Sequence, residues 1–560
     1  MSNNIKKKTL PEVHLEQISA SYSVENFKYS GGDLGNGRYK NFVIYGDYAD
    51  PDVIRVGDDY YAISSTFHFN PGITVLHSKD LVNWKLIGHV VDDLSKLHPS
   101  FSFQRMNGYG AGIWAPAIRF HDNKYWVYVG GPNLGLIYST AEKPEGPWSA
   151  PKRLKFNSPW QGTKLIDCCP FWDEDGKAYF VAAEPKWYND YTVPDYKVHL
   201  FEMSSDGERL LDDGVVIHGG RITEALKFYK KDGYYYILYT EHPYDEASRR
   251  TQFAARSKNI YGPYERKKLI HSHDPKRDMC PSQGGLVETT DGKWYFLCHG
   301  MYNENESIGR PLMLLPVNWE DGWPIIGQDM DGDGVTEMVW EAEKPIQGYE
   351  PMLPQTSDDF EESKLSPQWQ WNHAPRNDRW SLTENPGSLR LKASKPAYPG
   401  GFWSACNTLT QRIMGDKSVA TTMVDLKGME DGQYAGLCLM AKISHLVGVY
   451  MENGIKYIRY HNAKRIELNN PLERQEQFDG YYIEDLCLLD SDKVWFKVEI
   501  EDNYGTLLYS LDGNDFHLAS EKFEFIYYAW RGGRIGLFSW NEFKDDGHVD
   551  FQWFKYDIIH

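Results

Sequence analysis

A five-fold repeat dominates the first part of this chain. In each copy a polar turn pair begins eight residues after a polar or aromatic residue, and a large apolar residue precedes the turn by four positions. The turn pairs are Asp58-Asp59, Asp122-Asn123, Asp175-Gly176, Asp232-Gly233 and Asp291-Gly292. Such pairs tolerate the positive φ of a tight turn, so each copy predicts a β-hairpin. Repeats of this kind bury their apolar faces against one another, and the sequence therefore predicts a five-bladed β-propeller over residues 38–340.

The residue that opens each copy is the candidate for chemistry. These residues are Asp50, Trp114, Asp167, Glu224 and Gln283. The blades of a propeller surround a central channel, so equivalent positions of successive blades converge in space. Acids that cap turns or face solvent are the alternative interpretation, but each of these acids precedes a strand that is otherwise apolar. We therefore predict three carboxylates at the channel.

Composition narrows the class of protein. The chain has a formal net charge of -19 and 15% aromatic residues, with 19 Trp and 38 Tyr. Aromatic residues favour strands, and their flat faces also suit contacts with sugar rings. A net negative charge, without a row of Lys and Arg residues interleaved with aromatic residues, argues against nucleic-acid binding. No apolar run approaches the roughly 18 residues that a membrane span needs, so no membrane role is expected.

The N-terminus and the cysteines bear on the compartment. No apolar stretch follows the lysines at positions 6–8, so the sequence predicts no signal peptide and a cytoplasmic location, or a periplasmic or secreted one if a leader was removed. The seven cysteines show no zinc-binding spacing. We expect buried free thiols in a reducing compartment.

The pattern changes after the propeller. Residues 1–37 are predicted to form an N-terminal arm, and residues 341–357 a linker rich in Pro, Glu and Gln. Residues 358–560 show short alternating segments separated by Gly, Asn and Asp, which predict an antiparallel β-sandwich. The whole chain is thus expected to be all-β. Because the linker is short, we expect the sandwich to pack on the propeller and to lend a loop to the rim of its channel.

Several segments, taken in order, resemble glycoside hydrolase family 43. They are GDYADPDVIRVGDDYYAISST, GIWAPAIRFHDNKYW, LIDCCPFWDEDGKAYF, RITEALKFYKKDGYYYILY, QGGLVETTDGKWYF and GRPLMLLPVNWEDGWPIIG. The later DDFEESKLSPQWQWNHAP and WSLTENPGSLRLKA are similar to the sandwich domain that accompanies the propeller in the β-xylosidases and α-L-arabinofuranosidases of that family. The resemblance implies that Asp50 is the general base, that Glu224 is the general acid, and that Asp167 orients its neighbours and modulates their pKa.

The chemistry of the residues agrees with these roles. Glycoside hydrolysis needs one carboxylic acid to protonate the leaving oxygen and one carboxylate to activate water or to attack the sugar. A third acid nearby raises the pKa of the proton donor by like-charge repulsion. Asp50 and Glu224 lie on blades separated by the fifth blade, so we expect them to face each other across the channel. That favours the wider separation, roughly 6.5 to 9.5 Å, of inverting enzymes.

Further residues are candidates for substrate contacts. Trp114 could stack on a sugar or pack between blades, and Phe67 and His68 could close the sugar pocket or pack in the core. Arg310 matches an arginine that holds sugar hydroxyls in the family, and its planar fork offers several directed donors. Gln283 stands near a point where many relatives carry a histidine that orders an ion or water, so a channel metal is in doubt. His299 could substitute for that histidine or be structural.

An acidic loop near the end of the propeller resembles the first half of a calcium loop. Its candidate ligands are Asp329, Asp331, Asp333 and Glu337. Trp340 stands where an EF-hand would have its bidentate Glu, so a solvated acidic turn is the alternative. A structural calcium would have no part in catalysis, for which we expect no cofactor.

These observations predict an exo-acting, inverting glycoside hydrolase that releases xylose from the non-reducing ends of β-1,4-xylo-oligosaccharides. An α-L-arabinofuranosidase acting on arabinoxylan-type side chains is the alternative, and one enzyme could do both. A non-catalytic carbohydrate-binding propeller is a third interpretation. Three mutually repelling carboxylates argue against it, because a lectin does not need them. The expected partner is an oligosaccharide or polysaccharide, and the sequence does not specify an oligomeric state.

Overall fold

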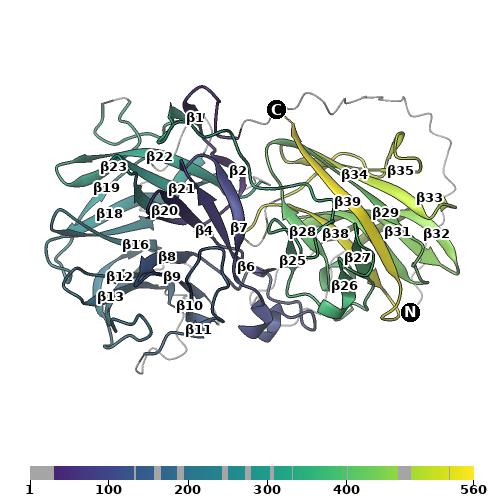
Figure 1. Ribbon diagram of the computed structural model, residues 1–560, viewed down its shortest axis with the longest axis horizontal. Coiled ribbons are helices and arrows are strands. Elements are labelled where there is room, and N and C mark those ends of the chain that lie inside the picture. Colours follow the sequence, from purple (N-terminus) through teal and green to yellow (C-terminus); the bar gives the residue numbers. More distant parts are fainter. Residues whose placement is uncertain are drawn as a thin grey trace.

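The computed structural model describes residues 31–131, 134–156, 165–185, 195–242, 250–271, 279–302, 308–330, 332–399, 401–464, 481–526, 528 and 530–559. Two β bodies lie side by side, the propeller coloured purple to teal and the sandwich green to yellow (Figure 1). Within the described residues the helical elements are short 3-10 turns: η2 (Leu94–Lys96), η3 (Pro99–Phe101), η4 (Asn377–Arg379) and η5 (Gly401–Ser404). None of the helices among them is long and apolar enough to cross a membrane. The prediction of an all-β chain is confirmed.

Five antiparallel sheets form the blades of the propeller, as predicted. Four blades follow the chain strand by strand from the channel outward: β3 (Asp52–Val56), β4 (Asp59–Ser64), β6 (Gly72–Ser78) and β7 (Trp84–Val91); β8 (Pro116–His121), β9 (Lys124–Gly131), β10 (Gly135–Ala141) and β11 (Lys152–Arg153); β12 (Ile166–Trp172), β13 (Ala178–Glu184), β14 (Asp195–Met203) and β15 (Val215–Arg221); β16 (Glu224–Lys231), β17 (Tyr234–Glu241), β18 (Thr251–Ser257) and β19 (Glu265–Lys268).

The fifth blade joins the two ends of the propeller segment. It contains β20 (Met279–Glu288), β21 (Trp294–Tyr302) and β22 (Pro311–Glu320), and the outer edge of β22 pairs with both β23 (Trp323–Ile326) and the early strand β2 (Ile44–Asp47). A strand from the start of the propeller thereby completes its last blade and closes the ring.

The predicted hairpins are present in all five blades, but their turns differ. Both residues of Asp122-Asn123 and of Asp232-Gly233 have positive φ, as a type I′ turn requires. In the first blade Val56 pairs with Asp59, so the turn is Gly57-Asp58, and the predicted pair Asp58-Asp59 is wrong by one residue. Gly57 takes φ 63° there, which glycine adopts without a steric penalty.

The innermost strands are irregular at the residues that open the repeats. Asp50, Asp167 and Gln283 all have positive φ, at 53°, 49° and 53°. The pairing register shifts beside Asp167 and Gln283, and again just after Glu224. Bulges of this kind re-aim side chains and are common next to active sites. The repeated irregularity turns side chains of equivalent positions away from the regular pleat.

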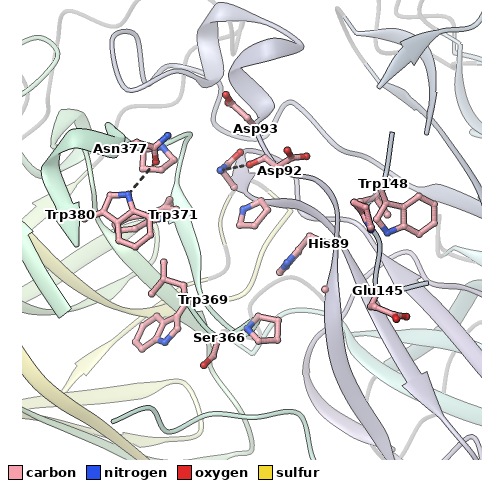
Figure 2. Close-up of a pocket in the computed structure, with 18 residues that line it drawn as sticks. His89, Asp92, Asp93, Glu145, Trp148, Ser366, Trp369, Trp371, Asn377 and Trp380 are labelled. Carbon is pink, nitrogen blue, oxygen red and sulfur yellow. Dashed lines mark hydrogen bonds between the residues drawn. The ribbon is translucent and has the colours of Figure 1, made fainter. Parts of the chain in front are cut away.

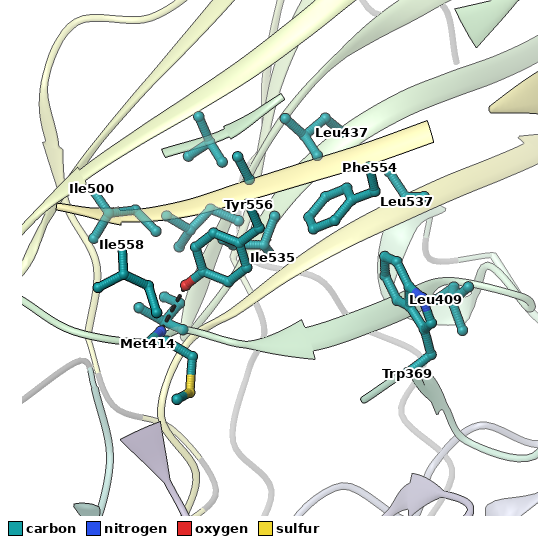
Figure 3. Packing of buried hydrophobic residues seen from close by; sticks show 14 of the residues in the cluster. Trp369, Leu409, Met414, Leu437, Ile500, Ile535, Leu537, Phe554, Tyr556 and Ile558 are labelled. Carbon is teal, nitrogen blue, oxygen red and sulfur yellow. Dashed lines mark hydrogen bonds between the residues drawn. The ribbon is translucent and has the colours of Figure 1, made fainter. Parts of the chain in front are cut away.

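The sandwich has two packed sheets. The first runs β33 (Tyr481–Leu489), β32 (Ile455–Lys464), β31 (Ile443–Glu452), β30 (Gln433–Met440), β38 (Arg534–Asn541), β28 (Leu409–Arg412), β25 (Gln370–Asn372) and β5 (Phe69–Asn70). The second runs β26 (Trp380–Ser381), β27 (Leu389–Lys392), β39 (His548–Ile559), β29 (Lys417–Asp425), β34 (Lys493–Glu501), β35 (Tyr504–Ser510) and β36 (Phe516–Leu518), with β37 (Phe523–Glu524) also on β35. Figure 3 shows the buried side chains between them, where the Met414 amide donates a hydrogen bond to the Tyr556 hydroxyl at 2.6 Å.

The two bodies share a sheet and a core. Strand β5 belongs to the propeller segment, yet it pairs with β25 and so forms the last strand of a sandwich sheet. One buried cluster contains Ile44 and Val53 of the propeller together with Leu409 and Leu537 of the sandwich. The sandwich therefore packs on the propeller as part of one continuous core.

The segment predicted as a linker is ordered along this seam. Its first residues form β24 (Glu341–Glu343), which pairs with β1 (Arg38–Lys40) at the start of the propeller. The Lys344 ammonium forms ion pairs with Asp33 and Asp80, and the amide of Met352 donates to the Asn83 side chain at 2.7 Å. These contacts fix the path of the chain between the two bodies.

Candidate active site

Asp50 is a buried carboxylate surrounded by donors. Its Oδ1 and Oδ2 accept hydrogen bonds from the two terminal nitrogens of Arg310, at 2.6 and 3.1 Å, and Oδ2 also accepts from the Ser65 hydroxyl at 2.6 Å. The Asp50 amide donates to Nδ1 of the buried His299 at 3.0 Å. Burial opposes ionisation, but the charge of Arg310, the neighbouring His299 and the Ser65 hydrogen bond outweigh it and lower the pKa of Asp50 to about 2.

The sandwich supports this arrangement directly. The second terminal nitrogen of Arg310 also donates to the Trp530 carbonyl at 3.1 Å. The Arg531 guanidinium lies 2.9 Å from the Asp47 carboxylate, and its Nη1 donates to the Ser65 hydroxyl at 3.4 Å. A loop of the second body therefore reaches the groups that hold Asp50, as expected for a loop lent to the channel.

Asp167 lies in a different electrostatic environment. It is 5% exposed, and its Oδ2 accepts a hydrogen bond from the Ala225 amide at 2.6 Å. Burial and then the negative charges of Glu224 and Asp50 raise the pKa of Asp167 to about 7. Near neutral pH this carboxyl group therefore carries a proton for part of the time.

Glu224 is held by an arginine that the sequence analysis did not single out. Arg250 forms an ion pair with Oε1 of Glu224, and its other terminal nitrogen donates to Oε1 of Gln283 at 2.8 Å. Arg250 directly precedes β18, the third strand of its blade. The repeat pattern covers the first two strands of each blade, so it gives no signal for this residue. Arg250 thus connects Glu224 with Gln283, and the negative charge of Glu224 lies close enough to Asp167 to raise the pKa of that group.

The predicted aromatic contacts fall in two places. The guanidinium carbons of Arg310 and Arg531 lie 5.8 and 5.4 Å from the centroid of the Phe67 ring. The centroids of the Phe67 and Trp114 rings are 6.3 Å apart. Phe67 and the partly buried Trp114 therefore form an aromatic wall next to Asp50. His68 packs against the rings of Tyr109 and His373 at the seam with the sandwich. This placement favours the packing interpretation for His68.

The acidic loop is arranged differently from a calcium loop. Asp329 accepts hydrogen bonds from the amides of Gly332 and Gly334 at 2.7 and 3.0 Å, and Asp331 lies outside the described residues. Asp333 and Glu337 instead meet His271, with Nε2 of the histidine 3.2 and 3.5 Å from their carboxylate oxygens. Calcium prefers six to eight oxygen ligands, and a histidine with two carboxylates fits it poorly. This loop does not contact Asp50, Asp167 or Glu224 in the described structure.

The arrangement offers two kinds of acid chemistry in one buried channel. Asp50 is a carboxylate that stays ionised throughout the neutral range, so it can accept a proton from water. Asp167 is a carboxyl group that titrates near neutrality beside Glu224. An ionised carboxylate together with a carboxyl group of raised pKa fits the requirement of glycoside hydrolysis for a base and a proton donor.

Comparison with known proteins agrees with this geometry. Residues 39–324 match the family described as "Glycosyl hydrolases family 43", and residues 357–557 match the "Beta xylosidase C-terminal Concanavalin A-like domain". A β-xylosidase of Formosa agariphila is 37% identical over 94% of this chain and 92% of its own length. A non-reducing end α-L-arabinofuranosidase of Bacteroides ovatus is 34% identical over 64% of this chain and 66% of its own. The crystal structure of a GH43 protein from Bacillus licheniformis superposes with a TM-score of 0.75, at 25% identity, over 93% of this chain and 100% of that one.

The propeller, with its buried carboxylates, and the sandwich together define a glycoside hydrolase. The chain belongs to glycosyl hydrolase family 43 and carries the C-terminal concanavalin A-like domain of its β-xylosidases. Its partner is accordingly a carbohydrate substrate.

Proposed function

We propose that this enzyme releases xylose, with inversion, from the non-reducing ends of β-1,4-xylo-oligosaccharides. The observation that carries the proposal is the environment of Asp50. Two nitrogens of Arg310 and the Ser65 hydroxyl hold this buried carboxylate, whose pKa is about 2. Such a group stays ionised at neutral pH and accepts a proton from water without being protonated in the resting state.

In the proposed mechanism water attacks the anomeric carbon while Asp50 takes its proton. Glu224 delivers a proton to the leaving oxygen. Arg250 pairs with Oε1 of Glu224, so the leaving oxygen of the substrate has to compete with this arginine for the Glu224 carboxyl group. Asp167 acts beside Glu224, where its charge rises as the pH passes through about 7. Phe67 and Trp114 supply apolar surface against the sugar ring.

The experiment that tests this proposal follows the first-formed product. Proton NMR of xylobiose hydrolysis should show the α-anomer of xylose first, because water attacks the face opposite to the leaving group. A first-formed β-anomer would make Asp50 a nucleophile and contradict the proposal. No release of xylose from xylobiose would reject the substrate.

An α-L-arabinofuranosidase activity in the same site is the second candidate. The 34% identity with an enzyme named for that activity supports it. Parallel assays with 4-nitrophenyl β-D-xyloside and 4-nitrophenyl α-L-arabinofuranoside, read as kcat/KM for one preparation, test it. Loss of both activities in Asp50→Ala would show that one site serves both.

We propose that the enzyme needs no cofactor and that any cation on the acidic loop is structural. His271, Asp333 and Glu337 bring three potential ligand atoms within 4.8 Å of one another. Treatment with EDTA should leave turnover unchanged, and at most lower Tm. A loss of turnover that calcium restores would contradict this proposal.

A further inference from the structure

A cavity lies at the seam between the first two blades and the sandwich. It measures about 470 Å³, and none of the residues that open the five repeats lines it (Figure 2). Its propeller side comes from β7 and from the segment between β10 and β11, and its sandwich side from the segment that includes β25 and β26. We call it the seam pocket. Its volume is in the range of sites that enclose a small ligand.

Tryptophans stand on both sides of the seam pocket. Trp148 lies on the propeller side, and Trp371 and Trp380 lie on the sandwich side (Figure 2). The rings of Trp371 and Trp380 are 5.2 Å apart and tilted by 49°. The indole N–H groups of Trp148 and Trp380 donate to the Pro144 carbonyl and to Asn377, each at 3.2 Å. With these donors engaged, the rings offer mainly apolar faces, whose negative quadrupole attracts the polarised C–H groups of a sugar ring.

The remaining lining is polar and acidic. Asp92, Asp93 and Glu145 contribute carboxylates and Asn377 an amide, all suited to hydroxyl groups.

His89 lies between the tryptophans of the two sides, and its buried Nε2 has no hydrogen-bond partner among the described residues (Figure 2). Burial, followed by the charges of Arg412 and Arg534, lowers the pKa of His89 to about 3, so the ring is neutral. A neutral imidazole can donate to or accept from a hydroxyl group.

This lining selects among ligand classes. Three carboxylates, in a chain of net charge -19, repel phosphates, nucleic acids and acidic peptides. A purely apolar ligand would leave the buried imidazole nitrogen without a partner. Tryptophans on both sides of the pocket, combined with hydroxyl-binding groups, fit a neutral polyhydroxyl ring.

We propose that the seam pocket is a second carbohydrate-binding site, separate from the channel, which holds one or two units of a neutral oligosaccharide. The identity of that sugar as a xylan-type chain rests on the proposed function. The pocket includes Asn70, three residues after Phe67 and on the strand β5 that joins propeller and sandwich. The site would thus bind a polymeric substrate next to strand β5, two residues after Phe67 in the aromatic wall of the channel.

The test combines binding with kinetics in the full-length protein. Asp50→Asn prevents hydrolysis, and calorimetry of this protein with xylohexaose should give two sites. Adding Trp148→Ala and Trp380→Ala, or Asp92→Ala and Glu145→Ala, should leave one site. The carboxylate pair is exposed, so its loss spares the fold, and Trp553→Ala on β39 is the matched tryptophan control that should keep both sites.

In the active protein the same tryptophan changes should raise KM for arabinoxylan at least five-fold. They should alter kcat/KM for 4-nitrophenyl β-D-xyloside less than two-fold. An unchanged number of sites in both double variants, or a single site in Asp50→Asn itself, overturns the proposal. A tryptophan-dependent dimer in sedimentation, without sugar binding, assigns the pocket to a second copy of the chain and also overturns it.

A panel of cello-, manno- and galacto-oligosaccharides separates this inference from the proposed function. One of these sugars could bind with an affinity that both double variants abolish, while no pentoside binds or is cleaved. That result would support the seam pocket and reject the proposed substrate. If xylobiose is cleaved but no sugar binds in a way that depends on Trp148 and Trp380, the proposed substrate stands and the pocket falls.

Discussion

Asp50 and Asp167 occupy equivalent positions of two blades and nevertheless have opposite character. Both open their repeats, both have positive φ near 50°, and both are buried, with 4% and 5% of their surface exposed. The pKa of Asp50 is about 2, whereas that of Asp167 is about 7. Burial raises both, so the difference comes from the neighbours. Asp50 faces a guanidinium and a hydroxyl, and Asp167 faces one amide and two negative charges.

The comparison shows that the repeat places a carboxyl group at the channel but does not decide its protonation state. The partners of Asp50 come from the first and fifth blades, and the sandwich holds those partners through Trp530 and Arg531. Within the described part of the chain no sandwich residue supports Asp167 in this way, and Glu224 pairs with Arg250. The ring thereby holds an ionised carboxylate and a carboxyl group of raised pKa at related positions.

Removing the sandwich should have the largest effect, because it deletes the contacts that support the partners of Asp50. Truncation after Glu341 would expose the shared core and delete the contacts of Trp530 and Arg531. We expect insoluble protein, or soluble protein with less than about 1% of the turnover, since a missing half of a core is not compensated elsewhere. Expression yield and 4-nitrophenyl β-D-xyloside hydrolysis measure this. A soluble truncate with parental turnover would show that the sandwich does not support Asp50.

Replacing the two proposed reactive groups should sharpen the difference between base and acid. Asp50→Ala should lower kcat on xylobiose and on 4-nitrophenyl β-D-xyloside alike, by about 10² to 10⁴-fold, because water must be activated whatever leaves. Glu224→Ala should be as damaging on xylobiose but milder on the aryl glycoside, whose phenolate departs without a proton. Equal losses of both variants on both substrates would remove the distinction between the roles.

Arg310 provides a direct test of why the pKa of Asp50 is low. In Arg310→Gln burial continues to raise the pKa of Asp50 while the largest opposing charge is gone. The acid limb of the kcat/KM profile should therefore move to higher pH, with kcat/KM about 10² lower at neutral pH. Arg310→Lys keeps the charge and serves as the matched control, with a smaller shift of that limb. An acid limb at the parental pH in both variants would assign the low pKa to other groups.

The smallest effect is expected for Asp167→Asn, which should leave substrate binding nearly intact. It should cost less activity than the loss of Asp50, about ten- to hundred-fold in kcat, and lower the apparent pKa of the high-pH limb, which the proposed general acid Glu224 sets. Identical pH profiles for this variant and the parent would remove the modulating role of Asp167.

The same variant tests the raised pKa of Asp167 through stability. In the folded protein this pKa lies at about 7, above the ordinary value of 3.8, so the stability it contributes is present below pH 3.8 and is lost as the pH rises through 7. Asparagine cannot ionise, and Tm of Asp167→Asn should therefore exceed that of the parent at pH 8 but not at pH 4. A Tm difference that does not change between these pH values would contradict the raised pKa.

Much of the architecture could be read from local patterns. The repeats predicted five hairpins and a propeller because turn chemistry and strand alternation are properties of neighbouring residues. The error at Asp58-Asp59 has the same origin, since Gly57 competes for the positive φ one residue earlier. The alternating segments after residue 358 likewise predicted the sandwich. The contacts of the predicted linker with Asp33, Asp80 and Asn83 could not be read from local patterns, because these partners are distant in sequence.

The sequence by itself determined the ring, the second β body and the column in which Asp50, Asp167 and Glu224 stand. Only the tertiary structure decided which of these carboxyl groups is ionised, that Arg250 pairs with Glu224, and that His68 packs at the seam while Phe67 borders the channel. The physical reason is the range of the interactions. A hairpin is set by adjacent residues, whereas Asp50 depends on an arginine 260 positions away, and Ser65 contacts an arginine 466 positions away. Charges act through space, so the chain had to be folded before these pKa values were defined.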